Sequence, residues 1–160
     1  MGLDMHLVQK RKHKRLIYEN TEELIYWRKA NAVHKFFVDK CCNGIDDCSY
    51  GEVKKKDLEE LRDICSEILK KVTTEKAKVV ISKTYNIDKK EWEPQYADGE
   101  VITNPEICEE LLPTQAGFFF GSTEYDNYYL EDIRYTLEQI NNVLESTDFK
   151  NYKLYYISSW

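Results

Sequence analysis

The sequence has few glycines and prolines and no long apolar run. It contains 6 Gly and 3 Pro in 160 residues, which excludes a collagenous, low-complexity or disordered chain. No run of about 18 apolar residues is present, so a transmembrane helix is not expected. The first six residues lack the apolar core of a signal peptide, and we therefore expect a cytoplasmic location. The length predicts one domain over residues 1–160.

Basic residues are missing from a large part of the chain. Residues 91–132 contain no Lys or Arg but 11 Asp or Glu, and the whole chain has a formal net charge of −6. A stretch of this kind repels a phosphate backbone and disfavours nucleic acid as a partner. The one dense positive run, Lys10–Arg15, is typical of a solvated turn, although it could also contact phosphate.

Cysteine spacings typical of metal sites are also absent. The five cysteines include no Cys-x-x-Cys pair, and the spacing of Cys42 and Cys48 matches no common zinc site. Asp46 and Asp47 are open to two interpretations, a Mg²⁺ site or a capped turn. A nucleophile pair of Cys48 and His34 would lack a third residue to orient it. We predict no metal site and no cofactor, and we assign no catalytic residue.

Hydrophobic periodicity predicts a single α+β domain, with a small, mostly antiparallel sheet packed against three main helices. Residues 56–72 give the clearest helix, with apolar side chains at helical spacing. Two more helices are expected, one over residues 22–41 capped by Thr21, and one that begins with a capping box at Thr123 and ends near Glu145. The other expected elements are strands at 3–9, 16–18, 79–81, 117–121 and 152–157, a hairpin turn at Asp98-Gly99, and a short helix from Pro105 to about Leu112.

The expected helix 22–41 carries one candidate binding face. Trp27, Asn31 and His34 follow each other at helical spacing, and Tyr26 and Arg28 flank them. An indole for stacking, an amide for a base edge and a guanidinium for phosphate together suit a planar, anionic ligand such as a nucleotide. The alternative is structural, with Trp27 in the core and His34 as a hydrogen-bonded core histidine.

The segment Leu111–Asp126 is the second candidate. It places glycine and hydroxyl side chains before an expected helix N-terminus, which is favourable for an anion. Glu124 and Asp126 would compete with an anion for the same helix dipole, and Thr123 is also suited to capping. Gly117 and Gly121 bracket three Phe, which indicates backbone that another group approaches closely. The candidate ligand-binding residues here are Thr114, Gln115, Phe119, Gly121, Ser122, Thr123 and Tyr125.

Aromatic residues are concentrated toward the C-terminus. Residues 117–160 contain 12 of the 21 aromatic residues. Strand alternation places Phe119 opposite Phe118 and Phe120, and Tyr155 opposite Tyr156. We therefore expect some rings to lie on a second surface, either a pocket or an interface.

Four motifs together resemble a family of short, uncharacterised proteins encoded mainly by phages and prophages. They are Met1-Gly-Leu-Asp-Met5, Tyr26-Trp-Arg-Lys-Ala-Asn-Ala-x-His34, Asp46-Asp-Cys48 and Leu111-Leu-Pro-Thr-Gln-x-Gly-Phe-Phe-Phe-Gly-Ser-Thr-x-Tyr-Asp126. The resemblance spans nearly the whole chain, although His6 stands where the family has Tyr. It implies a small phage accessory protein acting in the cytoplasm of a bacterial host cell, where such proteins counter host defence or redirect host machinery.

Three functions remain open at this point. The first is a small-molecule-binding protein that sequesters a nucleotide immune signal, as a homo-oligomer with its pocket near a subunit interface. The second is a hydrolase that cleaves such a nucleotide, with His34 as acid or base and Asp46 and Asp47 on a metal. The third is an inhibitor that binds a host protein through an acidic, Tyr-rich surface.

Overall fold

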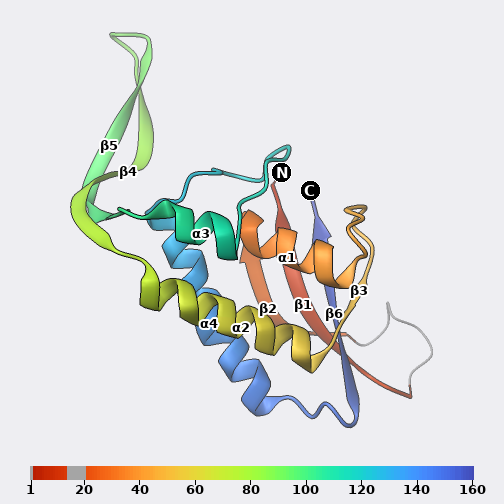
Figure 1. Ribbon diagram of the computed structural model, residues 1–160. Helices are drawn as coiled ribbons and strands as arrows, with labels where there is room; N and C mark the ends of the chain where they lie inside the picture. Colours follow the sequence, from red (N-terminus) through yellow and green to blue (C-terminus); the bar gives the residue numbers. More distant parts are fainter. Residues whose placement is uncertain (1, 14–20) are drawn as a thin grey trace.

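Four strands form an antiparallel sheet at the centre of the protein (Figure 1). The computed structural model describes residues 2–13 and 21–160, so the expected strand at 16–18 lies outside the described residues. Asp4 pairs with Ser159, which brings both ends of the described chain together in the sheet. The strands are β1 (Asp4–Arg11), β2 (Glu22–Arg28), β3 (Gly51–Val53) and β6 (Tyr152–Ser159), in the order β2-β1-β6-β3.

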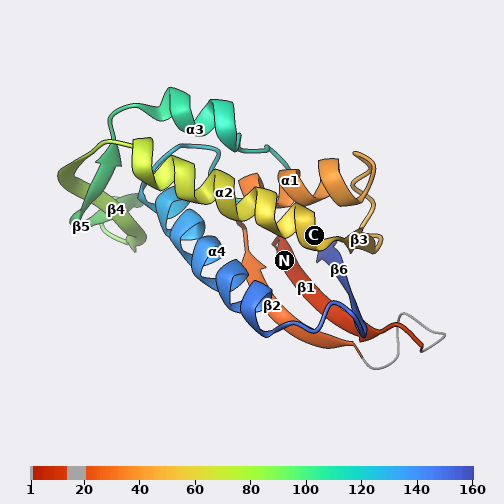
Figure 2. The ribbon, with the colours of Figure 1, turned by 60° about the horizontal axis from the view of Figure 1, so that its bottom comes forward.

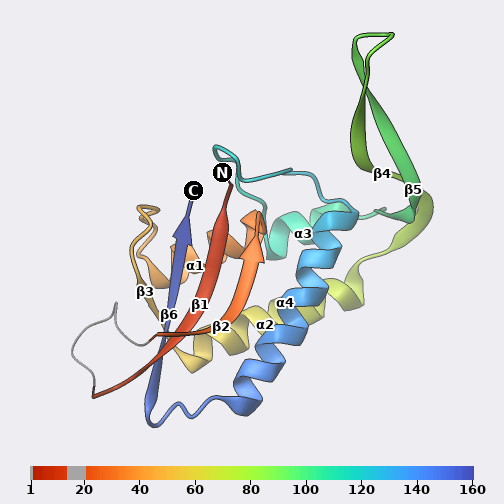
Figure 3. The same cartoon turned by 180° about the vertical axis from the view of Figure 1, so that it is seen from behind.

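Three helices, α1 (Asn31–Cys41), α2 (Lys55–Lys71) and α4 (Asn127–Ser146), cover one face of this sheet (Figures 2 and 3). A short helix, α3 (Pro105–Leu111), begins at its predicted proline. The apolar side chains of α2 and α4 recur at helical spacing and are buried in the core, so the predicted α+β class with three main helices is confirmed. None of the helices in the described part of the chain is long and apolar enough to cross a membrane.

The strands β4 (Thr74–Asn86) and β5 (Glu91–Ile102) form a separate two-stranded arm that projects from the body (Figure 1). The prediction of a turn at Asp98-Gly99 was wrong, because both residues lie inside β5. The chain turns over residues 87–90 instead. The side-chain oxygen of Asn86 accepts hydrogen bonds from the N–H groups of Asp88 and Lys89, at 3.0 and 3.1 Å, and stabilises this turn.

The predicted helix 22–41 is wrong in its first part. Residues 22–28 form β2, in which Ile25 and Trp27 are buried and Tyr26 is exposed, as strand alternation requires. Lys29 has a φ of 58°, which ends the strand and allows α1 to begin two residues later. Thr21 therefore caps no helix. Trp27 belongs to a strand, while Asn31 and His34 belong to a helix, and the three do not share one helix face.

The segment 113–126 contains no strand, so the prediction for residues 117–121 was also wrong. The backbone N–H of Phe120 donates to the carbonyl of Gly117, and Phe119 has a φ of 63°, which folds the segment into a turn. Phe120 is buried, whereas Phe118 and Phe119 are exposed. The cap of α4 is Asp126, whose carboxylate accepts from the N–H of Tyr129 at 3.1 Å, and not Thr123.

Candidate ligand-binding pocket

Two residues of the candidate binding face are buried and have partners inside the protein. The indole N–H of Trp27 donates to the hydroxyl of Thr136 at 3.0 Å. His34 is fully buried, with Nδ1 hydrogen-bonded to the Tyr156 hydroxyl at 2.6 Å and Nε2 donating to the Asp46 carboxylate at 2.9 Å. Burial raises the pKa of the Tyr156 hydroxyl well above its usual range. Trp27 and His34 therefore hold the core together, as the structural alternative proposed.

Asn31, the first residue of α1, organises the segment 113–126. Its side-chain amide donates to the carbonyls of Phe120 and Ser122, at 3.1 and 2.8 Å. Its side-chain oxygen accepts from the backbone N–H of Gln115 at 3.1 Å. Asn31 is itself buried, so one side chain fixes three backbone groups of a segment more than 80 positions further along the chain.

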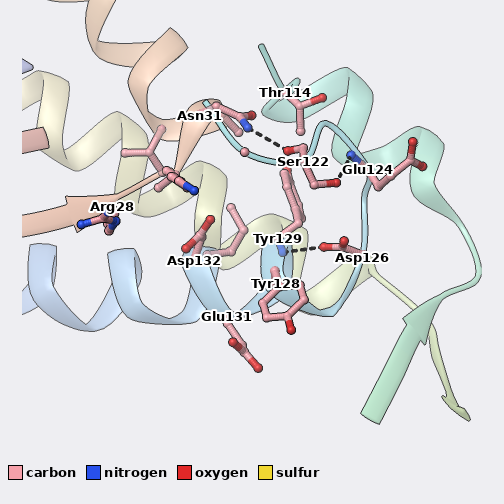
Figure 4. Close-up of a pocket in the computed structure, with 16 residues that line it drawn as sticks. Arg28, Asn31, Thr114, Ser122, Glu124, Asp126, Tyr128, Tyr129, Glu131 and Asp132 are labelled. Carbon is pink, nitrogen blue, oxygen red and sulfur yellow. Dashed lines mark hydrogen bonds between the residues drawn. The ribbon is translucent and has the colours of Figure 1, made fainter. Parts of the chain in front are cut away.

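A pocket of about 430 Å³ lies next to Asn31 (Figure 4). Three parts of the chain form its walls: residues 28–33 at the junction of β2 and α1, the segment 113–126, and the first turns of α4. Its volume is in the range of small-molecule sites, roughly 300–1,000 Å³. Ala32 and Val33, in the first turn of α1, line it, and the N–H groups of a first helical turn have no partner within the helix.

The charges of the pocket are divided between its walls. Arg28 and Lys29 supply the positive charge at the β2–α1 junction, while Glu124, Asp126 and two residues of α4 supply negative charge on the other side. The guanidinium of Arg28 is more than half exposed and lies 3.8 Å from Asp4. The pocket is therefore suited to a ligand with both an anionic group and hydrogen-bond donors.

Two carboxyl groups of the pocket, Glu124 and Asp132, have no hydrogen-bond or ion-pair partner among the described residues, and of these Glu124 is exposed whereas Asp132 is half-buried. Asp126 caps α4, and Glu131 accepts a hydrogen bond from Asn127 at 2.7 Å. Asp132 forms no hydrogen bond or ion pair with any residue that the structure describes, and it lies between Arg28 and Asp126 in the view of Figure 4. Burial, followed by repulsion from Glu131 and Asp126, raises the pKa of Asp132 to about 7.

Tyr128 and Tyr129 complete the α4 wall. Tyr129 is buried and donates its hydroxyl to the carbonyl of Leu112 at 2.8 Å. Tyr128 is exposed, and its hydroxyl donates to the carbonyl of Val80 in the arm at 3.1 Å. The ring of Tyr128 is thus anchored at its hydroxyl end and offers an aromatic surface at the pocket.

The structure brings five of the predicted site residues to this pocket. These are Arg28, Asn31, Thr114, Gly121 and Ser122. Gly121 has a left-handed φ of 88°, and the group that approaches it is Lys29 of the same chain.

The other predicted residues lie elsewhere or act through their backbone. Tyr26 is on the sheet face away from the helices and donates its hydroxyl to Asp4. The carbonyl of Thr123 accepts from the Thr114 hydroxyl, and the hydroxyl of Tyr125 accepts from the Thr114 N–H. Trp27, His34, Gln115 and Phe119 do not line the pocket either.

Sequence reasoning missed Lys29, Tyr128 and Asp132. A signal for Asp132 was present, because it lies three residues after Tyr129 and four before Thr136, both buried on α4. A carboxylate at that position of a helix lies at the border of the buried stripe. It also closes the stretch 91–132 that has no basic residue to pair with it.

The residues considered for metal or nucleophilic chemistry are used structurally. Asp46 binds His34 and also accepts from the indole N–H of Trp160 at 3.1 Å, while Asp47 accepts from the N–H of Ser49 at 3.0 Å. Cys48 is a free thiol in the loop between α1 and β3. Among the described residues, no group of three or more His, Cys, Asp or Glu is placed to hold a metal ion.

Comparison with known proteins adds no assignment. No protein-family model matches the chain, and searches of curated proteins and of solved structures gave no significant match.

Proposed function

We propose that the protein binds a small nucleotide-like ligand in the pocket and sequesters it without converting it. The observation that carries this proposal is Asp132, a half-buried carboxyl without a partner among the described residues, facing a pocket whose opposite wall carries Arg28 and Lys29. A phosphate would bind at Arg28, Lys29 and the first turn of α1. An N–H group of the base would donate to Asp132, and Tyr128 would contact the ring.

The charge balance limits the class of ligand. Four carboxyl groups and two basic side chains line the pocket, so a ligand with many phosphate charges is disfavoured. Phosphodiesters, with one charge per phosphate, fit this balance better than triphosphates do. Cyclic dinucleotides and ADP-ribose derivatives are therefore the compounds to test, and a phage protein that sequesters such a host immune signal would counter the defence of the cell.

The test is calorimetry and thermal shift of the full chain with these compounds. We expect one of them to bind, and Arg28→Ala and Asp132→Asn each to weaken its binding by at least about tenfold, because each removes a charge-assisted hydrogen bond. Lys35→Ala and Asp39→Asn are matched controls, since these residues form an exposed ion pair on α1 outside the pocket. Neither control should change the affinity.

Two outcomes would contradict the proposal. The first is that no compound binds and that host signalling stays intact when the protein is expressed. The second is recovery of the ligand in cleaved form after incubation. Cleavage would support the hydrolase alternative, with Asp132 as the acid or base that lines the pocket.

A further inference from the structure

The outer half of the β4–β5 arm, residues 82–97, projects away from the body (Figure 1). The arm is held at its base, where the N–H of Thr103 donates to the carbonyl of Thr73 at 2.8 Å, and at Val80 and Ile81, whose carbonyls accept from Tyr128. Among the described residues, no hydrogen bond, ion pair or ring contact joins residues 82–97 to the body. A two-stranded ribbon of this kind is only marginally stable alone in water.

The outer arm is amphipathic. One face carries the pair Lys83–Pro94 at its middle, with Val80 opposite Tyr96 on one side of it and Tyr85 opposite Trp92 on the other. The Tyr85 and Trp92 rings pack together with centroids 5.4 Å apart. The side chains of Val80, Tyr96, Tyr85 and Trp92 are 38–64% exposed. The opposite face of the same stretch is polar and is formed by the pairs Ser82–Gln95, Thr84–Glu93 and Asn86–Glu91. The apolar face therefore has the composition of a contact surface.

The charges beside this face are of both signs. Lys78 of β4 and Asp98 of β5 form an ion pair next to Val80 and Tyr96 on the apolar face. A partner of one charge sign would attract one of these groups and repel the other. A second copy of the arm can be related to the first by a twofold axis that runs parallel to the strands, so that the two apolar faces meet. Lys78 would then lie over Asp98 of the partner subunit, and each apolar pair would lie over the same pair of the partner.

We propose that two copies of this chain associate through the apolar faces of their arms. Edge-to-edge pairing through β5 would instead bring identical acidic strands together, because β5 carries four Asp or Glu and no basic residue. The exposed parts of the four apolar side chains offer on the order of 300 Å² per copy. This is less than the roughly 800 Å² of a standard interface, so association is weak and sensitive to salt.

The first test is the mass of the full chain in solution, measured by light scattering and sedimentation over a roughly hundredfold range of concentration. We expect a monomer–dimer equilibrium that Trp92→Ser and Tyr96→Ser weaken by at least about tenfold. Ile87→Ser is the matched control, because Ile87 is exposed in the turn, beyond the paired residues that carry the apolar face. It should leave the equilibrium unchanged.

The second test is a charge exchange between two variants. Lys78→Asp creates a purely acidic pair and Asp98→Lys a purely basic pair, so each variant alone should lose self-association. A mixture of the two should form a heterodimer, since each charge then faces its opposite on the partner.

If the variants failed to associate only because like charges repel each other within one arm, mixing the two variants would not restore association. A chain that is monomeric at every concentration, or a mixture that stays monomeric while wild type dimerises, overturns the proposal. If the chain is monomeric, the apolar face of the arm would be available to bind a different protein, as the host-inhibitor hypothesis requires.

Discussion

At the scale of single residues, burial and partners decide which ionisable groups are available for function. His34 is fully buried and has a partner at each ring nitrogen, whereas Asp132 is half-buried and has none among the described residues. A satisfied buried group stabilises the fold, and an unsatisfied one is a candidate for binding. Because of this difference in hydrogen-bond partners, and not because of residue type, Asp132 is the candidate functional residue and His34 is not.

Asp132 should make the free protein less stable as the pH rises. Its pKa is about 7 in the folded chain, against 3.8 as the ordinary value, so the folded state binds the proton more tightly between these values. The free energy of unfolding therefore falls as the pH rises from about 4 to about 7. We expect Asp132→Asn to be about 1 to 2 kcal/mol more stable than wild type at pH 8 and similar to it at pH 4.

Denaturant unfolding at several pH values checks this expectation. Glu145→Gln, at an exposed carboxyl group near the end of α4 and away from Asp132, serves as the control and should change stability by less than about 0.5 kcal/mol. A stability difference between Asp132→Asn and wild type that does not depend on pH would show that Asp132 is ionised without penalty in the folded protein.

At the scale of elements, the segment 113–126 is irregular, yet it forms a wall of the pocket. Its shape depends on contacts from outside the segment, above all the three hydrogen bonds from Asn31. Gly117 also allows the Phe120 ring to fold back, since a Cβ at Gly117 would lie 2.4 Å from that ring. The wall is thus built by the start of α1 and by close packing within the segment.

Removing the Asn31 side chain should loosen this wall. Asn31→Ala deletes three hydrogen bonds and leaves buried backbone groups unpaired, for an expected loss of about 2 to 3 kcal/mol. Denaturant unfolding measures the loss, and limited proteolysis should show faster cleavage within residues 113–126. Asn127→Ala is the matched control, because Asn127 is the first residue of α4 and its hydrogen bond to Glu131 is exposed. Equal effects of the two changes would contradict the role given to Asn31.

At the scale of the whole molecule, the body and the arm are separate parts of one chain. The helices and the four-stranded sheet share one hydrophobic core, and the outer arm contributes no buried side chain to it. The base of the arm is closed by Thr73, Thr103 and Asn104, whose side-chain oxygen accepts from the Thr73 N–H at 2.8 Å. The body should therefore fold without the outer arm.

Excision of the arm tests this division. Replacing residues 76–100 with Asn-Gly, a two-residue hairpin turn, keeps the pairs Glu75–Val101 and Thr74–Ile102. We expect the helical circular dichroism to persist and the Tm to fall by less than about 5 °C. Adding Asn104→Ala to the shortened chain removes the side-chain hydrogen bonds that close the base of the arm. This should lower the free energy of unfolding by about 2 kcal/mol more. Loss of cooperative unfolding on excision alone would mean that the arm is needed for the fold.

Local pattern was sufficient for part of the fold. The helices α2 and α4 were predicted because their apolar residues follow the helical period, and the strands β1 and β6 because their apolar residues alternate, although loosely in β1. The break between β2 and α1 was missed because Lys29 and Ala30 carry no turn signal, and the apolar residues on both sides also fit a single helix. The hairpin turn was misplaced because Asp98-Gly99 is a stronger local signal than the side chain of Asn86.

The sequence by itself determined the α+β class, two long amphipathic helices and the shortage of basic residues in 91–132, and it singled out Asn31 and the segment Leu111–Asp126 as candidates for binding. Only the tertiary structure decided that Trp27 and His34 are core residues, that Asp132 faces Arg28 and Lys29, and that the arm stands apart. The physical reason is the distance along the sequence over which each effect acts. Periodicity and turn chemistry act between residues a few positions apart, whereas the pocket joins residues 28–33 to residues 114–133, and only packing brings such distant side chains together.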